Sequence, residues 1–272
     1  MGLLPDIGIL PILVADEEDY FDKEDIKLEL TLFKSARNRD AALQAGELDG
    51  TISDLLAVYY LNSSGIGVKA LSVVESRFMI LGAKESGISN LEELDGEDIG
   101  LSKNTVIEYI VDTILAERGL KYQEINIPEI PVRMELLNKS KIKAACLPDP
   151  LATVLEKSGA RSLIDSHSYG LDPVVLIFTE RTVDDTKLLK DFFRAYNRGV
   201  KALNNNPEKY RKLLFSRGEF PEQIIKDIDI PTYRPAEAPS RDEVDKILKW
   251  VATKKRENSN LMYGDLVKQN IF

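Results

Sequence analysis

Small polar residues stand directly before several stretches of this chain that have helical patterns. Ser35, Asp54 and Thr105 are the clearest of them. Their side chains accept hydrogen bonds from the first free amides of a helix, and the positive end of the helix dipole favours a polar or anionic group there. This chemistry holds a small solute without reacting with it. The positions expected to bind such a solute are Asp6, Ser35, Ser53, Asp54, Ser76, Asn104, Thr105, Pro131, Pro148 and Asp149.

Catalytic and metal chemistry find little support in the residue types. Asp54, Glu108 and Asp149 are carboxylates near the expected site, but paired-carboxylate catalysis needs defined separations, and helix capping explains these residues. His167 is the only histidine and Cys146 the only cysteine, so neither a Ser-His-Asp arrangement nor a Cys/His metal site can be assembled. We therefore expect no catalytic residue, no metal and no cofactor.

Composition narrows the class of protein. The 272 residues are 43% hydrophobic, which predicts a packed core in one large or two modest domains. The net charge of −9 argues against a nucleic-acid partner, since that affinity depends on clustered Lys and Arg. No apolar run reaches the roughly 18 residues of a membrane span.

Strand and helix patterns alternate through the first 180 residues. Strands are expected at 25–33, 49–53 and 68–74, with helices between them, and this order is typical of a mainly parallel sheet covered by helices. The pattern restarts after 78–84, where Thr105 and Glu108 form a capping box before the next helix. Beyond the apolar strand 174–179, all remaining patterns are helical.

The helical C-terminal part has apolar faces but no sheet of its own. It is therefore expected to pack on the first unit, giving a discontinuous domain 1 of 1–80 and 181–272 and an inserted domain 2 of 83–177. The strands 78–84 and 174–179 then cross between two α/β domains, which predicts a hinge and a ligand cleft. The turn Pro5–Gly8 follows the first strand, and its amides are expected to face that cleft.

Several segments carry a family resemblance. These are the G-x-x-P-x-x-x-x-x-P-x-x-x-A opening at Gly2, the segment "AALQAGELDG" with the following "SDLL", "SKNTVIEY", "AACLPDPLATVLEKSGAR" and "FFRAYNRGVKALNNNPEKY". In order and spacing the chain resembles the substrate-binding proteins of ABC importers in the nitrate/sulfonate/taurine and thiamine-precursor (NMT1/THI5-like) group. The resemblance implies a periplasmic-binding-protein-like fold of type II.

The resemblance also implies a function and a set of binding positions. It implies an extracytoplasmic monomer, in the periplasm or lipid-anchored, that captures a small molecule by hinge closure and delivers it to ABC permease and ATPase subunits. We expect a signal segment or lipid anchor to precede Met1. The binding positions that carry over are Asp6 with Ile7, Ser35 with Ala36, Ser53 with Asp54, Asn104 with Thr105, and Pro148 with Asp149.

Two questions stay open at the level of sequence. Helix dipoles favour an anionic ligand, but Asp6, Asp54 and Asp149 bring negative charge to the same positions. We therefore expect a thiamine-precursor-like heterocycle ahead of a sulfonate, and both ahead of nitrate. The alternative function is an enzyme of the same fold, such as a menaquinone-pathway dehydratase or lyase.

Overall fold

The computed structural model describes residues 1–220, 222–226, 228–255 and 260–272, and the chain divides into two compact units. Unit 1 contains residues 1–33, 38–75 and 173–272. Unit 2 contains residues 34–37 and 76–172. Each unit has its own five-stranded sheet.

The sheet of unit 1 has the strand order β2-β1-β3-β10-β4. Its strands are β1 (Gly2–Leu3), β2 (Thr31–Leu32), β3 (Gly50–Asp54), β4 (Val68–Val73) and β10 (Val174–Thr179). β1 runs parallel to β2 and β3, whereas β10 is antiparallel to both of its neighbours, β3 and β4. The last strand in the sequence thus lies between two of the first.

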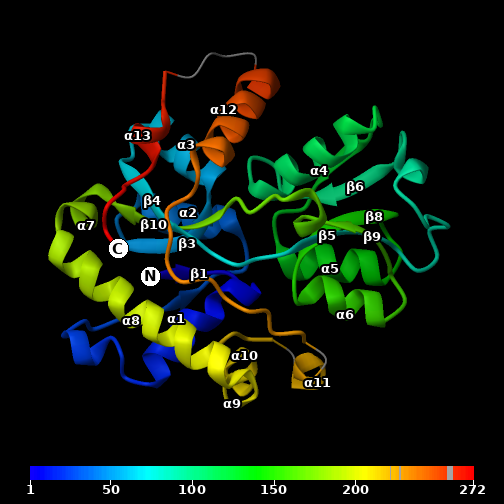
Figure 1. Cartoon of the computed structure of the whole chain (residues 1–272). Coiled ribbons are helices and arrows are strands. Elements are labelled where there is room, and N and C mark those ends of the chain that lie inside the picture. Colours follow the sequence, from blue (N-terminus) through cyan, green and yellow to red (C-terminus); the bar gives the residue numbers. More distant parts are fainter. Residues whose placement is uncertain (221, 227, 256–259) are drawn as a thin grey trace. The chain divides into compact units, whose positions relative to one another are not determined.

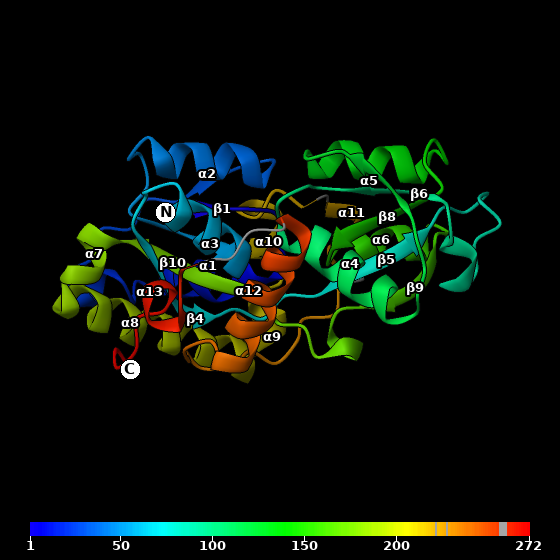
Figure 2. The ribbon, with the colours of Figure 1, turned by 90° about the horizontal axis from the view of Figure 1, so that it is seen from above.

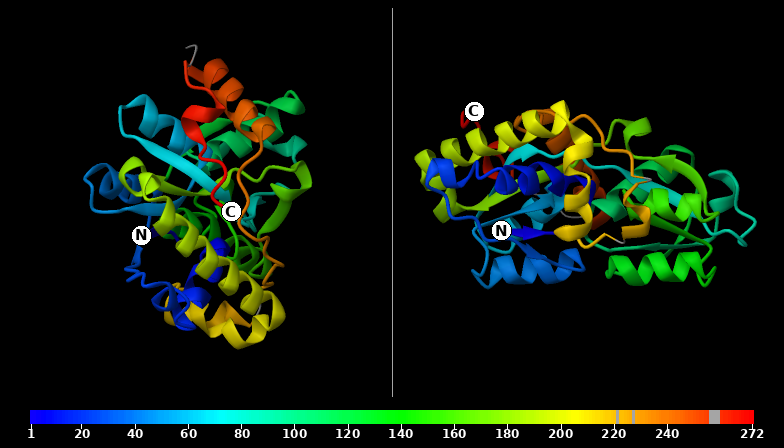
Figure 3. Two further views of the ribbon diagram at one scale, coloured as in Figure 1. Left: turned by 60° about the vertical axis from the view of Figure 1, so that its left-hand side comes forward. Right: turned by 90° about the horizontal axis from the view of Figure 1, so that it is seen from below.

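Two helix pairs cover this sheet. Helix α1 (Leu10–Glu17) packs along α8 (Thr186–Asn205), as Figures 1 and 3 show. Helix α3 (Leu55–Ser63) packs against α12 (Arg241–Lys255). The C-terminal helices therefore bury their apolar faces within unit 1. The shorter helices of this part are α7 (Glu180–Asp184), α9 (Pro207–Tyr210), α10 (Lys212–Ser216), α11 (Glu222–Ile225) and α13 (Tyr263–Leu266).

Unit 2 has the strand order β7-β6-β8-β5-β9. Its strands are β5 (Phe78–Gly82), β6 (Asp98–Leu101), β7 (Gln123–Asn126), β8 (Ala144–Pro148) and β9 (Arg161–Asp165). β6 is parallel to β7 and β8, and β5 is antiparallel to β8 and β9. Helices α5 (Ile130–Asn138) and α6 (Leu151–Lys157) lie on one side of the strands and α4 (Val106–Glu117) on the other (Figures 1 and 2).

The predicted α/β fold class is confirmed by these two helix-covered sheets. Apart from the short segment 34–37, which belongs to unit 2, the chain passes between the units at 75/76 and 172/173, a few residues before the boundaries expected near 80 and 177. The reason is that β5 pairs with strands β8 and β9 of unit 2, and β10 pairs with strands β3 and β4 of unit 1. In the described part of the chain, no helix is both long and apolar enough to cross a membrane.

The strand expected at 25–33 is wrong in its length. Only Thr31 and Leu32 form β2, because the partner strand β1 has just two residues to pair with. The preceding residues alternate between exposed and half-buried without joining the sheet. The alternation of side chains is present, but a residue joins the hydrogen-bond ladder only where a neighbouring strand lies alongside it.

Candidate functional site

In unit 1, four of the expected binding residues lie at one edge of the sheet. Asp6 and Ile7 follow β1, while Ser53 and Asp54 end β3, which runs parallel to β1. The antiparallel β10 begins at the same edge, where Val174 pairs with Asp54. The carboxyl ends of parallel strands thus bring these residues together, as expected for α/β sheets.

The two carboxylates at this edge cap helical turns. Asp6 Oδ1 accepts a 2.7 Å hydrogen bond from the Gly8 amide, and Asp54 Oδ1 accepts a 2.8 Å bond from the Ala57 amide at the start of α3. Both side chains are buried. Each therefore fixes the backbone that precedes or follows it, and the capping role expected from the sequence at Asp54 is confirmed.

A buried arginine that the sequence did not single out supports the end of β3. Arg39, from helix α2 (Ala36–Gln44), donates from Nη1 to the Ile52 carbonyl at 3.0 Å and from Nη2 to the Ser53 hydroxyl at 2.6 Å. Its charge is paired with Asp40 at 2.8 Å. The hydroxyl oxygen of Ser53 thus already accepts a hydrogen bond from the Arg39 guanidinium. Nothing in the local pattern marks Arg39, because its partners lie 13 and 14 residues away.

The turn after β1 is held by a distant segment. The Tyr233 hydroxyl donates a buried 2.8 Å hydrogen bond to the Ile7 carbonyl, 226 residues away in sequence. Burial raises the pKa of Tyr233 well above its usual value, so the hydroxyl remains a donor at neutral pH. A Cβ on Gly8 would come within 2.6 Å of Val74 and 2.8 Å of the Glu75 carbonyl. Only glycine allows the turn to approach the end of β4 this closely.

Replacing Tyr233 by phenylalanine is expected to destabilise the protein by about 1–3 kcal/mol, because the buried Ile7 carbonyl loses its donor. Chemical denaturation followed by circular dichroism measures this loss. The matched control is Tyr20→Phe, which keeps the ring contacts of Tyr20 with Lys23 and Arg198. Equal stability of Tyr233→Phe and the control would show that the hydroxyl does not hold the turn.

In unit 2, the ends of β6 and β8 and the start of β5 share one edge. Phe78 pairs with Pro148, and the Asp149 amide donates to the Arg77 carbonyl at 2.8 Å. This edge therefore carries the expected residues Ser76, Asn104, Thr105, Pro148 and Asp149.

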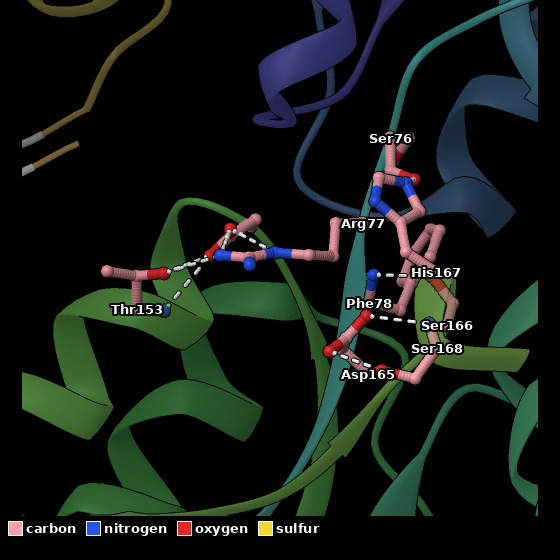
Figure 4. Close-up of polar contacts among 9 residues, drawn as sticks. Ser76, Arg77, Phe78, Thr153, Asp165, Ser166, His167 and Ser168 are labelled. Carbon is pink, nitrogen blue, oxygen red and sulfur yellow. Dashed lines mark hydrogen bonds and ion pairs between the residues drawn. The ribbon is translucent and has the colours of Figure 1, made fainter. Parts of the chain in front are cut away.

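Arg77 and Asp149 form an ion pair at this edge. Arg77 Nε donates to Asp149 Oδ2 at 2.8 Å, Nη2 donates to the same oxygen, and Nη2 also reaches the Thr153 hydroxyl at 3.2 Å. Figure 4 shows the Arg77 side chain extended toward Thr153 on α6. The other carboxylate oxygen accepts from the amide and hydroxyl of Thr153. Asp149 is therefore neutralised and fully engaged.

The loop between β6 and α4 is closed by its own hydrogen bonds. The Thr105 hydroxyl accepts from the Ile107 amide at 3.2 Å and donates to the Ser102 carbonyl at 2.7 Å. The Glu108 carboxylate accepts from the amide of Asn104, one residue earlier than the capping box expected at Thr105. Asn104 adopts a left-handed conformation with φ of 59°. This backbone turn brings its amide within reach of Glu108.

His167 lies close to Ser76 and Asp172, the residues of unit 2 at which the chain enters and leaves that unit. Its Nε2 is 3.1 Å from the carbonyl oxygen of Ser76 (Figure 4). The same nitrogen is 3.6 Å from Asp172 Oδ1. Ser166 holds the neighbouring start of β5, because its hydroxyl accepts from the Phe78 amide at 3.1 Å. The sequence left His167 as a loop residue, and it lies in a short 3-10 helix at 167–169.

The remaining expected residues lie at the starts of α2 and α5. The segment 34–37, which includes Ser35 and Ala36, belongs to unit 2, where the Lys34 carbonyl accepts from the Ile130 amide at 3.2 Å. Ser35 is buried and Ala36 half-buried. Pro131, in the first turn of α5, is exposed, as is Asn104. Of the twelve expected positions, these two are the exposed ones.

One cluster of carboxylates has oxygens close enough together for a metal ion. In the described residues, Glu108, Asp112 and Glu124 each offer an oxygen within 4.8 Å of the others. Each has a protein partner: the Asn104 amide for Glu108, the Tyr122 hydroxyl at 2.6 Å for Asp112, and Lys103 at 2.8 Å for Glu124. These donors and the lysine charge account for the cluster without a cation.

The structure is similar to those of several known binding proteins. The chain superposes on the ligand-binding component of an ABC-type import system from Staphylococcus aureus, solved with zinc bound, at a TM-score of 0.84 and 15% identity, covering 99% of this chain and 96% of that one. The chain also superposes on the alkanesulfonate-binding protein SsuA from Xanthomonas axonopodis pv. citri, bound to MOPS. The TM-score is 0.84 and the sequence identity 14%, and the match covers 99% of this chain and 97% of that one. For the nitrate-binding protein NrtA from Synechocystis, the TM-score is 0.72 and the sequence identity 14%, and the match covers 84% of this chain and 67% of that one.

These superpositions show a shared fold, the periplasmic-binding-protein-like fold expected from the sequence. The sequence has no significant match among curated proteins. The family model described as "NMT1/THI5 like" matches residues 6–210, well over half of the chain. This segment contains every expected binding position in both units. The chain therefore belongs to the NMT1/THI5-like family.

Proposed function

We propose that this protein is the extracytoplasmic solute-binding component of an ABC importer, which captures a small organic molecule and delivers it to a permease. The observation that supports this most is the extent of the structural match to SsuA, 99% of this chain and 97% of that one. Membership of the NMT1/THI5-like family agrees with a small-molecule ligand. The polar residues at the sheet edges of each unit would supply the contacts.

The proposed ligand is either a sulfonate or a thiamine-precursor-like heterocycle. Sulfonate is suggested by the likeness to SsuA, and the heterocycle by the negative charges of Asp6 and Asp54 in unit 1. Both carboxylates already accept a backbone amide, so neither requires a cationic ligand to be satisfied. The two classes of ligand are therefore to be compared directly.

A thermal-shift screen is expected to find a stabilising ligand among sulfonates and pyrimidines. A ligand present at 100 times its dissociation constant adds about 2.7 kcal/mol to the free energy of unfolding, which raises the melting temperature by several degrees. A screen of both classes in which no compound raises the melting temperature would contradict the proposed function. Calorimetric titration then gives the stoichiometry, expected to be one.

The position of the site is tested by two capping aspartates of unit 1. Asp54→Ala and Asp185→Ala each remove an N-cap, at α3 and at α8, and each should cost about 0.5–2 kcal/mol. Only Asp54→Ala is expected to weaken ligand binding, because Asp185 lies away from the sheet edge that carries Asp6 and Ser53. An unchanged dissociation constant for Asp54→Ala would leave Asp54 with capping alone.

Binding without turnover is part of this proposal. The bound compound, recovered after long incubation and analysed by mass spectrometry, is expected to be unchanged, and conversion would favour an enzyme of the same fold. Capture by hinge closure and an extracytoplasmic location are proposed from the family resemblance. Small-angle scattering with and without ligand tests the first, and fractionation of cells tests the second.

A further inference from the structure

Two arginines flank the end of strand β8 in unit 2, and among the described residues a single carboxylate, that of Asp149, pairs with them. Arg77 binds Asp149 on the β5 side of the strand. Arg133, from α5, lies on the β6 side. This end of β8 therefore carries one positive charge in excess, at an edge where the expected binding residues Ser76, Pro148 and Asp149 lie.

Arg77 has one donor group to spare. Its Nε and Nη2 are occupied by Asp149 and Thr153, whereas Nη1 makes no hydrogen bond to any residue that the structure describes. The side chain is 33% exposed, while its anchor Asp149 is only 11% exposed. A guanidinium held on one edge by a buried carboxylate presents its free edge in a fixed direction. That arrangement is suited to an oxyanion.

Arg133 is fully buried, and no carboxylate of the described residues pairs with it. Its Nε donates to the Cys146 carbonyl at 2.9 Å and its Nη1 to the Ile127 carbonyl at 2.5 Å. Within the described chain, Nη2 has no hydrogen-bond partner and no carboxylate lies within ion-pair distance of the side chain. Burial lowers the pKa of Arg133 to about 10, so it remains charged at neutral pH.

The Arg133 guanidinium lies near the carboxyl end of β6. The Ile127 amide donates to the Leu101 carbonyl, and Ala145 pairs with Gly100, so the two carbonyls that Arg133 bridges stand on either side of the end of β6. The loop that follows β6 carries Asn104 and Thr105. An unpaired buried charge is costly, and two neutral carbonyls do not compensate it. A bound anion at this edge would.

We propose that unit 2 contains an anion subsite at the carboxyl end of β8, in which Arg77 Nη1 contacts the anionic group of the ligand and Arg133 sets the preference for an anion. This inference rests on the proposed function and deepens it, because it selects a sulfonate or another oxyanion over a neutral heterocycle. Arg77 is the contact residue. Arg133 is a positioning residue that acts through its charge.

The test compares methanesulfonate with methanesulfonamide, a neutral compound of similar shape, by calorimetric titration of the full chain. Arg77→Met is expected to weaken sulfonate binding at least about thirtyfold, since it removes a charged hydrogen-bond donor. Arg133→Met is expected to weaken sulfonate binding about tenfold and leave sulfonamide binding unchanged. A purely structural role for Arg133 would weaken both ligands alike. Arg161→Met, an exposed arginine of the same unit, is the matched control and should change neither.

The outcomes separate this inference from the proposed function. Wild-type protein that binds pyrimidines or other neutral solutes but no sulfonate overturns the anion subsite and leaves solute binding intact. Wild-type protein that binds no solute at all overturns both. Should Arg133→Met fail to fold, Arg133→Lys keeps the charge and should retain the preference for sulfonate over sulfonamide, and loss of that preference contradicts the proposal. Sulfonate binding unaffected by Arg77→Met also contradicts it.

Discussion

Replacing Phe193 by alanine is expected to lower the free energy of unfolding by about 3–5 kcal/mol. Phe193 is 1% exposed and its ring meets Phe178, Phe192, Tyr196 and Phe272 at centroid distances between 4.8 and 6.3 Å. The substitution removes a ring that contacts four other aromatic rings. Helix α8 cannot move to fill the cavity, because it is packed against α1. Chemical denaturation with intrinsic fluorescence measures the loss.

The control for this prediction is Phe215→Ala on α10. Phe215 is 48% exposed, so the same change in composition should cost about 1 kcal/mol or less. The comparison removes any general effect of losing a phenylalanine from the unfolded chain. Similar losses for the two variants would mean that the aromatic cluster does not hold α8 to the sheet of unit 1.

The second large effect is expected from Gly199→Ala in α8. An added Cβ would lie 2.5 Å from the Pro11 carbonyl oxygen and 2.8 Å from the Ala15 Cβ, both on α1. Backbone atoms cannot rotate away, so the two helices must separate. We expect a loss of about 1–3 kcal/mol despite the gain of about 1 kcal/mol in helix propensity. Thermal and chemical denaturation should agree on the sign.

Gly264→Ala in α13 is the matched control for this change. Gly264 is also helical, and no described atom outside its chain neighbours and its own helix backbone lies within 4 Å of the position that a Cβ would take. Here the propensity term acts alone, and the variant should be as stable as the wild type or slightly more so. Stabilisation by Gly199→Ala as well would show that α1 and α8 are not in close contact.

Much of the fold was predictable because the signals are local. The capping aspartate before α3, the threonine before α4 and the period of apolar residues in α8 each act within one or two helical turns. The length of β2 was not predictable, since it depends on a partner strand at the start of the chain. The antiparallel placement of β10 was also missed, because its neighbours lie more than 100 residues away.

The candidate sites show the same division. The edges at which Asp6, Asp54 and Asp149 lie follow from the order of strands and helices. Arg39 and Tyr233 could not be anticipated, because each acts on a carbonyl that is distant in sequence. The charge balance in unit 2 could not be predicted from the sequence either. Arg77, Lys103 and Arg133 are three basic residues whose ion-pair partners are known only from the fold. Within the part of the chain that the structure describes, Arg77 and Lys103 are paired with carboxylates and Arg133 is not.

The position of β10 between β3 and β4 has a consequence for synthesis on the ribosome. Residues 76–172 of unit 2 emerge before β10, so every strand of the unit 2 sheet is available while β3 and β4 still lack the neighbour that joins them. Domains generally fold as units during translation, with the N-terminal one first. In this chain the order is expected to be reversed. In a nascent chain stalled when residue 172 has left the ribosome and β10 has not, unit 2 should be protected from protease and residues 38–75 should be open to cleavage.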